Sequence, residues 1–164
     1  MCIRDRIRTY PDEFDVVGIS ANSNYETLTQ QVREFSPSLV NCNSFPKSFE
    51  ESLPKTTRLG SMNEMAKAEE VDILVTATTG YASLIPTFQA LEHGKSIAIA
   101  NKESIIMAGQ SLIDYARDHK ASLYPIDSEP SAIWQCLRGE ESPIHKLIIT
   151  ASGGPFRDLS LINI

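Results

Sequence analysis

Two acidic residues, Asp127 and Glu129, stand two positions apart directly after an apolar segment that ends at Ile126. In an extended chain, residues at this spacing point to the same side, so both carboxylates can reach one point. Two hard oxygen ligands, completed by water and substrate oxygens, suit magnesium or manganese. The alternative is a solvated acidic turn, or a cap for a helix that begins near Ser131.

A second polar segment, Asn101 to Ser104, follows a run of small apolar residues. At such a position Lys102 could meet a phosphate or a carboxylate. Ser104 could cap the next helix, whose free amide groups also attract anions. An ordinary solvated lysine explains Lys102 equally well.

Two further turns suit a phosphorylated ligand. The backbone of Ser152 to Gly154 can approach an anionic oxygen closely, although an ordinary turn is the other interpretation. Asn22, Ser23 and Asn24 follow a β-branched run. In a dinucleotide-binding unit, an acidic residue after the second strand binds the ribose of NAD and disfavours the extra phosphate of NADP. The neutral group therefore permits NADPH without requiring it.

These polar residues follow apolar segments that alternate between strand-like and helix-like periodicity. The alternation predicts an α/β fold with a doubly wound, mostly parallel, Rossmann-like sheet. Ligands of such sheets gather at the carboxyl ends of the strands. Strands are expected at 15–20, 39–42, 72–77, 96–100, 123–126 and 146–150, and helices at 25–35, 62–69, 84–93, 104–119 and 131–137, with a short helix plus loop within 43–60.

The glycine-rich turn that normally opens a dinucleotide-binding sheet does not occur before Asp15. We therefore expect the chain to begin after its own first strand, with Ile7 to Phe14 as the tail of the following helix. Met1 to Arg6 resemble neither a signal peptide nor an organised element and are interpreted as a non-native leader.

The composition excludes two classes of partner. A formal net charge of −6 argues against a general nucleic-acid binder, which needs a basic surface. The longest apolar runs have the length of strands, so no membrane span is expected. The three cysteines follow no metal-ligand pattern, and we expect reduced thiols in a cytoplasmic protein.

Three strings occur in the order and spacing of a known family: Ala-Asn-Lys-Glu-Ser at 100–104, Pro-Ile-Asp-Ser-Glu at 125–129 and Thr-Ala-Ser-Gly-Gly-Pro-Phe at 150–156. Segments 16–24 and 84–87 fit the same family. With them, the chain from Ile7 to Asp158 resembles 1-deoxy-D-xylulose 5-phosphate reductoisomerase. The resemblance implies conversion of this sugar phosphate to 2-C-methyl-D-erythritol 4-phosphate, with NADPH and Mg²⁺, Mn²⁺ or Co²⁺, by a homodimer of the non-mevalonate isoprenoid pathway.

The resemblance also implies domains and residue roles. Residues 7–125 would form an incomplete NADPH-binding domain, and residues 126–164 the beginning of an α+β catalytic domain. The implied cofactor-binding residues are Asn22, Ser23, Asn24, Asn101 and Glu103; the substrate-binding residues are Lys102, Ser128, Glu129 and Ser152; the metal ligands are Asp127 and Glu129; and the catalytic residues are Lys102, Asp127 and Glu129.

The sequence departs from the family at Pro130, where many members have histidine. The third metal carboxylate, a substrate histidine, the lid and the C-terminal helical domain are expected downstream, so the chain alone is predicted to be inactive. The alternatives are another Rossmann-fold oxidoreductase and a non-catalytic nucleotide-binding module.

Overall fold

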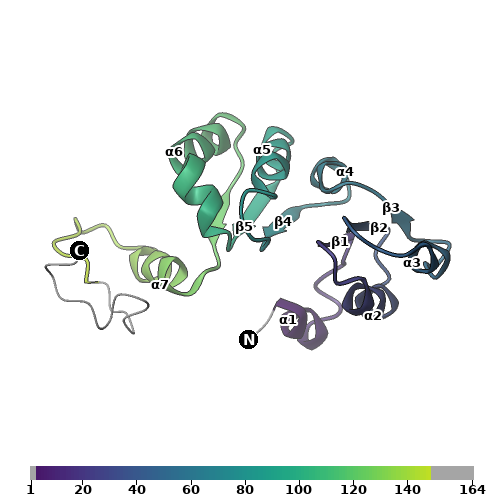
Figure 1. The fold of residues 1–164 in the computed structure, drawn as a ribbon. Coiled ribbons are helices and arrows are strands. Elements are labelled where there is room, and N and C mark those ends of the chain that lie inside the picture. The colour runs from purple at the N-terminus through teal and green to yellow at the C-terminus, as the bar shows by residue number, and fades with distance from the viewer. Residues whose placement is uncertain (1–2, 149–164) are drawn as a thin grey trace, which may run out of the picture. The chain divides into compact units, whose positions relative to one another are not determined.

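The computed structural model describes residues 3–148, and the chain divides into two compact units, one up to Ile126 and one from Asp127 onward. Strands and helices alternate through the first unit, and the second begins with a helix (Figure 1). The strands are β1 (Gly18–Ala21), β2 (Leu39–Cys42), β3 (Arg58–Leu59), β4 (Ile73–Thr76), β5 (Ser96–Ile99) and β6 (Leu123–Pro125). The helices are α1 (Ile3–Thr9), α2 (Tyr25–Phe35), α3 (Lys47–Glu51), α4 (Met62–Lys67), α5 (Leu84–Glu92), α6 (Lys102–Asp118) and α7 (Ser128–Leu137).

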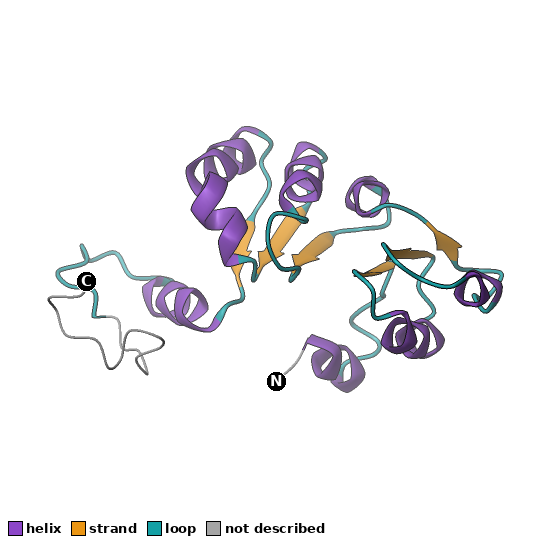
Figure 2. Cartoon of the chain, in the orientation of Figure 1, coloured by secondary structure: helices purple, strands orange, loops and turns teal. Residues whose placement is uncertain are grey.

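All strand pairs in the first unit are parallel, which confirms the predicted α/β class. The strands form two three-stranded sheets, in the orders β1-β2-β3 and β4-β5-β6 (Figure 2). Among the described residues, β1 and β4 do not pair with each other. The two-residue strand β3 was not predicted, since its polar surroundings carry no strand pattern.

The sheet β4-β5-β6 is covered by α5 and α6 around one apolar cluster. Ala90 and Leu91 of α5 and Leu112 of α6 are fully buried against Ile97 of β5. Burial of such side chains contributes about 1.5–3 kcal/mol each. The expected end of α5 is confirmed at Gly94, whose φ of +69° suits a residue without a side chain.

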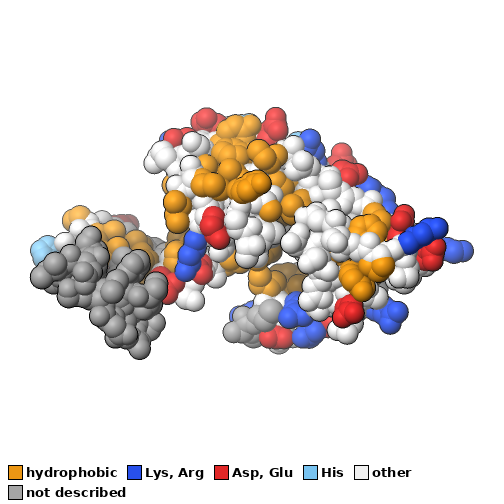
Figure 3. All heavy atoms as spheres, viewed as in Figure 1, with side chains coloured by type: hydrophobic (Ala, Val, Ile, Leu, Met, Phe, Trp, Pro, Cys, Tyr) orange, Lys and Arg blue, Asp and Glu red, His pale blue; other side chains and the backbone are white. Residues whose placement is uncertain are grey.

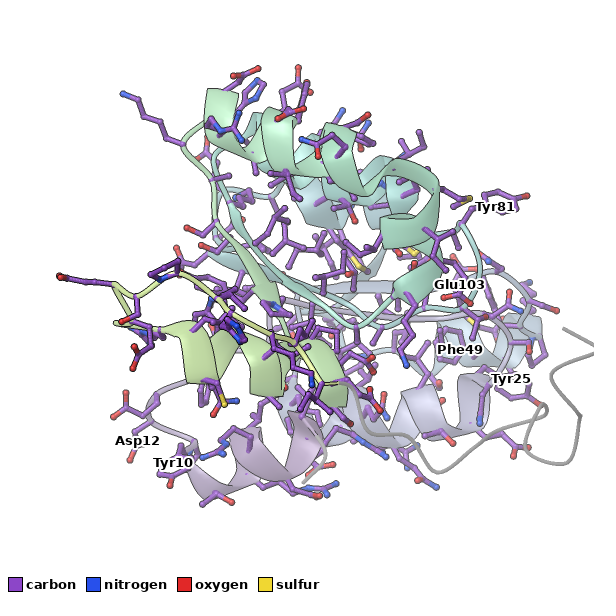
Figure 4. All side chains as sticks on the ribbon, turned by 90° about the vertical axis from the view of Figure 1, so that its left-hand side faces the viewer. Tyr10, Asp12, Tyr25, Phe49, Tyr81 and Glu103 are labelled. Carbon is purple, nitrogen blue, oxygen red and sulfur yellow. The ribbon has the colours of Figure 1, made fainter. Side chains whose placement is uncertain are left out.

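The other sheet packs against α2 and α3 around a second cluster. Leu28 and Val32 of α2 lie one turn apart and are buried with Val40 of β2 and Phe49 of α3. The ring of Tyr25 meets Phe49 edge-on, with centroids 6.3 Å apart (Figure 4). The helical spacing of these apolar side chains explains why α2 forms where the sequence predicted it.

Helix α1 begins at Ile3, so Ile3 to Arg6 form an organised element, contrary to the expectation of an unorganised leader. The Arg8 guanidinium donates to both carboxylate oxygens of Glu34, at 2.5 and 2.9 Å, and so ties α1 to α2. Arg8 and Glu34 are 26 positions apart, so no local sequence pattern predicts this ion pair. Within residues 3–148, no helix combines the length and apolar character needed to cross a bilayer.

Helix α4 opens with a capping box. The hydroxyl of Ser61 accepts a hydrogen bond from the amide of Glu64, and the Glu64 carboxylate accepts one from the amide of Ser61. The Ser61 amide, the Ser61 hydroxyl and the Arg58 guanidinium together lower the pKa of Glu64. The carboxylate therefore contributes to stability in its ionised form.

Candidate functional site

The turn after β1 is held by its own asparagines. Asn24 caps α2 by accepting a hydrogen bond from the amide of Thr27 at 3.0 Å. The Asn22 side chain accepts from the Asn43 amide group at 3.1 Å, which joins the turn to the end of β2. Ser23 is exposed between them. The predicted neutral turn is thus present, with Ser23 accessible to a ligand and both asparagines shaping the backbone.

Asn43 was not foreseen as part of this arrangement. Its backbone amide also donates to the carbonyl of Asn22 at 2.9 Å. The sequence could have predicted this role, because Asn43 follows β2 as Asn22 follows β1, and neighbouring parallel strands end at the same edge of a sheet.

The start of α6 and the loop after β4 are tied together by Asn101, which is only 2% exposed. Its Oδ1 accepts from the Ser104 amide at 2.6 Å and caps α6. Its Nδ2 donates to the carbonyls of Thr78 and Gly80, at 2.5 and 2.9 Å. The side chain thereby fixes the Thr78–Gly80 loop against the helix.

Glu103 adds a second tie to the same loop. Its Oε1 accepts from the Gly80 amide at 3.2 Å, and Gly80 has a φ of +64°, which favours glycine. Figure 4 shows Glu103 below Tyr81, which follows the loop and is 77% exposed. Two residues implied to bind cofactor therefore organise one loop at the carboxyl end of the sheet.

Lys102 is exposed in the first turn of α6. A helix N-terminus presents free amide groups and a partial positive charge. Lys102 adds a full charge at this end of the helix. The structure thus places the predicted lysine where a phosphate or carboxylate can be attracted.

Asp127 and Glu129 lie at the start of α7, and here the predicted geometry is wrong. Asp127 is still extended, at the N-cap position with φ −74° and ψ 151°, but the helix begins at Ser128, so Glu129 belongs to the first helical turn. The Ser131 amide donates to the carbonyl of Asp127 at 3.0 Å. The Asp127 side chain makes no capping hydrogen bond, and the helix can begin earlier than expected because Pro130 is tolerated in a first turn.

The two carboxylates still share one helical turn, with Asp127 half-buried and Glu129 exposed. They are hard oxygen donors of the kind that magnesium and manganese prefer. Over residues 3–148 no group of three or more histidine, cysteine, aspartate or glutamate side chains could hold a metal ion. The described donor set therefore fits a cation that takes further oxygen ligands from water, substrate or other residues.

Ser128 is exposed beside these carboxylates in the first turn of α7. Ser152 lies outside the described residues. The strand expected at 146–150 does not form over its described part, which is irregular up to Ile148.

Two family models match most of the chain. Residues 5–109 match the model described as 1-deoxy-D-xylulose 5-phosphate reductoisomerase, and residues 123–164 match the C-terminal domain of the same enzyme. The chain belongs to the 1-deoxy-D-xylulose 5-phosphate reductoisomerase family.

Curated members of the reductoisomerase family are similar in sequence to nearly the whole chain. The reductoisomerase of Thermoanaerobacter sp. (strain X514) is 41% identical over 160 residues, which cover 93% of this chain and 42% of that protein. The one from Geobacillus sp. (strain WCH70) is 42% identical over 161 residues, covering 94% and 42%. The chain therefore spans about 42% of the length of these relatives.

Solved reductoisomerase structures share the fold. A complex with NADPH, fosmidomycin and magnesium superposes with a TM-score of 0.78 at 33% identity, over 96% of this chain and 43% of that one. The NADPH complex of the Zymomonas mobilis enzyme gives a TM-score of 0.80 at 33% identity, over 97% and 44%.

Proposed function

We propose that this chain supplies most of the NADPH-binding domain and two metal ligands of a reductoisomerase that converts 1-deoxy-D-xylulose 5-phosphate to 2-C-methyl-D-erythritol 4-phosphate. The observation that carries the proposal is the match of both of its parts, 5–109 and 123–164, to one enzyme family. Residues 7–125 would form the cofactor domain and 126–164 the beginning of the catalytic domain. The resemblance also supports a cytoplasmic homodimer as the whole protein.

The polar turns at the strand ends support the proposed cofactor site. Asn22, Ser23 and Asn24 would line the adenosine ribose, with the Ser23 hydroxyl accessible and no carboxylate to repel a 2′-phosphate. The buried Asn101 side chain is fully engaged with Ser104 and the Thr78–Gly80 loop. We therefore assign Asn101 and Glu103 a positioning role, in which they hold this loop against the cofactor.

The proposed substrate site combines charge with hydroxyl groups. Lys102 would attract the anionic substrate, and Ser128 and Ser152 would donate hydrogen bonds to it. Asp127 and Glu129 would hold a divalent cation and keep substrate oxygens oriented beside it. When bound, the cation supplies Lewis-acid stabilisation of oxyanion character, and NADPH supplies the hydride for the reduction.

The test is a chimera in which residues 5–164 replace the matching segment of the Thermoanaerobacter reductoisomerase, which this chain covers to 42%. Circular dichroism and urea unfolding establish that the chimera folds. The proposal predicts NADPH oxidation that requires both 1-deoxy-D-xylulose 5-phosphate and Mg²⁺ or Mn²⁺. A folded chimera that binds NADPH without turnover would instead support a nucleotide-binding module.

Lys102 and Ser23 provide finer tests within the chimera. Lys102→Met is expected to raise KM for the sugar phosphate by about tenfold or more, the loss of one charge-assisted contact. Ser23→Asp should weaken NADPH relative to NADH, because a carboxylate repels the 2′-phosphate. Unchanged constants in both variants would remove these two residues from the proposed site.

A further inference from the structure

The turn after β1 is anchored to the end of β2 through one carbonyl group, that of Asn22. Its oxygen accepts hydrogen bonds from the backbone amides of Asn43 and Ser44, at 2.9 and 3.1 Å. The thiol of Cys42, the last residue of β2, donates to the same oxygen at 3.6 Å. A backbone carbonyl has two lone pairs, so this one is fully used. The backbone of Asn22 is therefore fixed.

The side chain of Asn22 is held by the same neighbour. The Nδ2 group of Asn43 donates to the Oδ1 atom of Asn22 at 3.1 Å. The Nδ2 group of Asn22 has two N–H donors. Asn22 is exposed, and among residues 3–148 no hydrogen bond involves this Nδ2 group. The contact with Asn43 thus decides which end of the Asn22 amide is available to a ligand.

The available end matters because the turn has no charge. In the cofactor site proposed above, this turn meets the adenosine ribose, whose 2′ position carries a hydroxyl in NAD and a phosphate in NADP. Residues 22–24 and 43–44 contain no charged side chain. Recognition of a phosphate there depends on hydrogen-bond donors, which an anion accepts strongly. An amide oxygen in the same place would disfavour the phosphate.

We propose that Asn43 is a positioning residue for cofactor specificity, which holds the Asn22 amide so that Nδ2 donates to the 2′-phosphate of NADPH. This inference rests on the proposed function and adds a specific contact to it. Asn43 acts through Asn22 and does not itself touch the phosphate. The pair gives the chain a preference for the phosphorylated nucleotide without an arginine or lysine in the turn.

Two nucleotides that differ only in the 2′-phosphate measure this contact on the 164-residue chain. They are adenosine 2′,5′-bisphosphate and adenosine 5′-monophosphate, and titration calorimetry gives a Kd for each. The ratio of the two Kd values measures the preference for the 2′-phosphate. A variant that only loosens the turn weakens both nucleotides and leaves the ratio unchanged. The ratio therefore separates a positioning role from a general structural one.

Three variants form a double-mutant cycle on this ratio. Asn22→Ala removes the donor and should lower the preference about tenfold, the loss of one hydrogen bond to a charged group. Asn43→Ala lets the Asn22 amide turn either end outward and should lower the preference about threefold. The double variant should match Asn22→Ala alone, because Asn43 acts only through Asn22. Urea midpoints establish that the variants are folded.

The matched control is Ser44→Ala, because Ser44 contacts Asn22 through its backbone amide and the substitution leaves that bond in place. A second control is Ile106→Ala on α6. Ile106 is 83% exposed, and Figure 3 shows hydrophobic side chains gathered over α5 and α6. Both controls should keep the parent ratio.

A second substitution at the same position tests the orientation directly. In Asn43→Asp the introduced carboxylate can only accept, so it takes the Nδ2 group of Asn22 and leaves Oδ1 outward. Ser44→Asp adds the same charge one position along the chain and keeps Asn43 in place. The preference for the 2′-phosphate should fall further in Asn43→Asp than in Ser44→Asp.

Four results would overturn the proposal. They are a parent chain that does not bind the bisphosphate, a parent chain that binds both nucleotides equally, an unchanged ratio in folded Asn43→Ala, and a double variant that loses the product of the two single losses. None of these readouts requires turnover. A chimera with turnover and an unchanged ratio rejects only the role of Asn43, whereas a chimera without turnover rejects the reductoisomerase activity and leaves the nucleotide result standing.

Discussion

Replacing Asn101 by alanine should destabilise the chain more than removing an ordinary helix cap. The side chain makes three hydrogen bonds, one to the Ser104 amide and two to the carbonyls of Thr78 and Gly80. Loss of the cap costs about 1 kcal/mol. Loss of the two bonds from a side chain that is 2% exposed costs about 1 kcal/mol each, so the total is about 3 kcal/mol.

The matched control is Asn24→Ala. Asn24 is exposed, and among the described residues its side chain makes one hydrogen bond, the capping bond from the amide of Thr27. Its expected cost is about 1 kcal/mol. With an m-value of about 2 kcal/mol/M, urea unfolding should place the midpoint of Asn101→Ala about 1 M below that of Asn24→Ala. Equal midpoints would refute the inference that Asn101 fixes the Thr78–Gly80 loop.

Three further predictions concern the packing and charges of the first unit. Leu112→Ala should cost about 2–5 kcal/mol because the side chain is fully buried, whereas Ile113→Ala, at 47% exposure, should cost under about 1 kcal/mol; thermal unfolding compares them. Hydrogen bonds at its helix cap lower the pKa of Glu64 from 4.5, so its stabilisation is present above that value and lost as the pH falls through the lower folded value. The difference in unfolding free energy between the parent chain and Glu64→Gln should therefore shrink between neutral pH and about pH 3. A difference that stays constant over this range would contradict the reasoning. A double-mutant cycle on Arg8 and Glu34 should give only a weak coupling, because both side chains are exposed and solvent screens the pair.

Much of the first unit could be predicted from local patterns. Strand β2 and helix α2 have the expected bounds, Leu39–Cys42 and Tyr25–Phe35, because apolar periodicity and flanking turn residues agree there. Gly94 ends α5 as expected. The polar strand ends were also located, since the carboxyl edge of a parallel sheet is where such residues gather.

The features that the sequence did not predict depend mainly on contacts between residues far apart in the chain. Helix α1 is tied to α2 by the pair Arg8–Glu34, which are 26 positions apart. The geometry of Asp127 and Glu129 differs from the prediction because the chain does not continue extended beyond Asp127, and Pro130 is tolerated in the first turn of α7.

The most direct test of the central claim is a metal titration of the chimera carrying Asp127→Asn or Glu129→Gln. The control is Glu140→Gln, which removes an exposed carboxylate of the second unit from a position after α7. If Asp127 and Glu129 hold the cation, each of their variants should need more Mn²⁺ for half-maximal NADPH oxidation and lose about 100-fold or more in turnover. The control should match the parent chimera. Folded variants with unchanged metal dependence would contradict the assignment of these carboxylates as metal ligands.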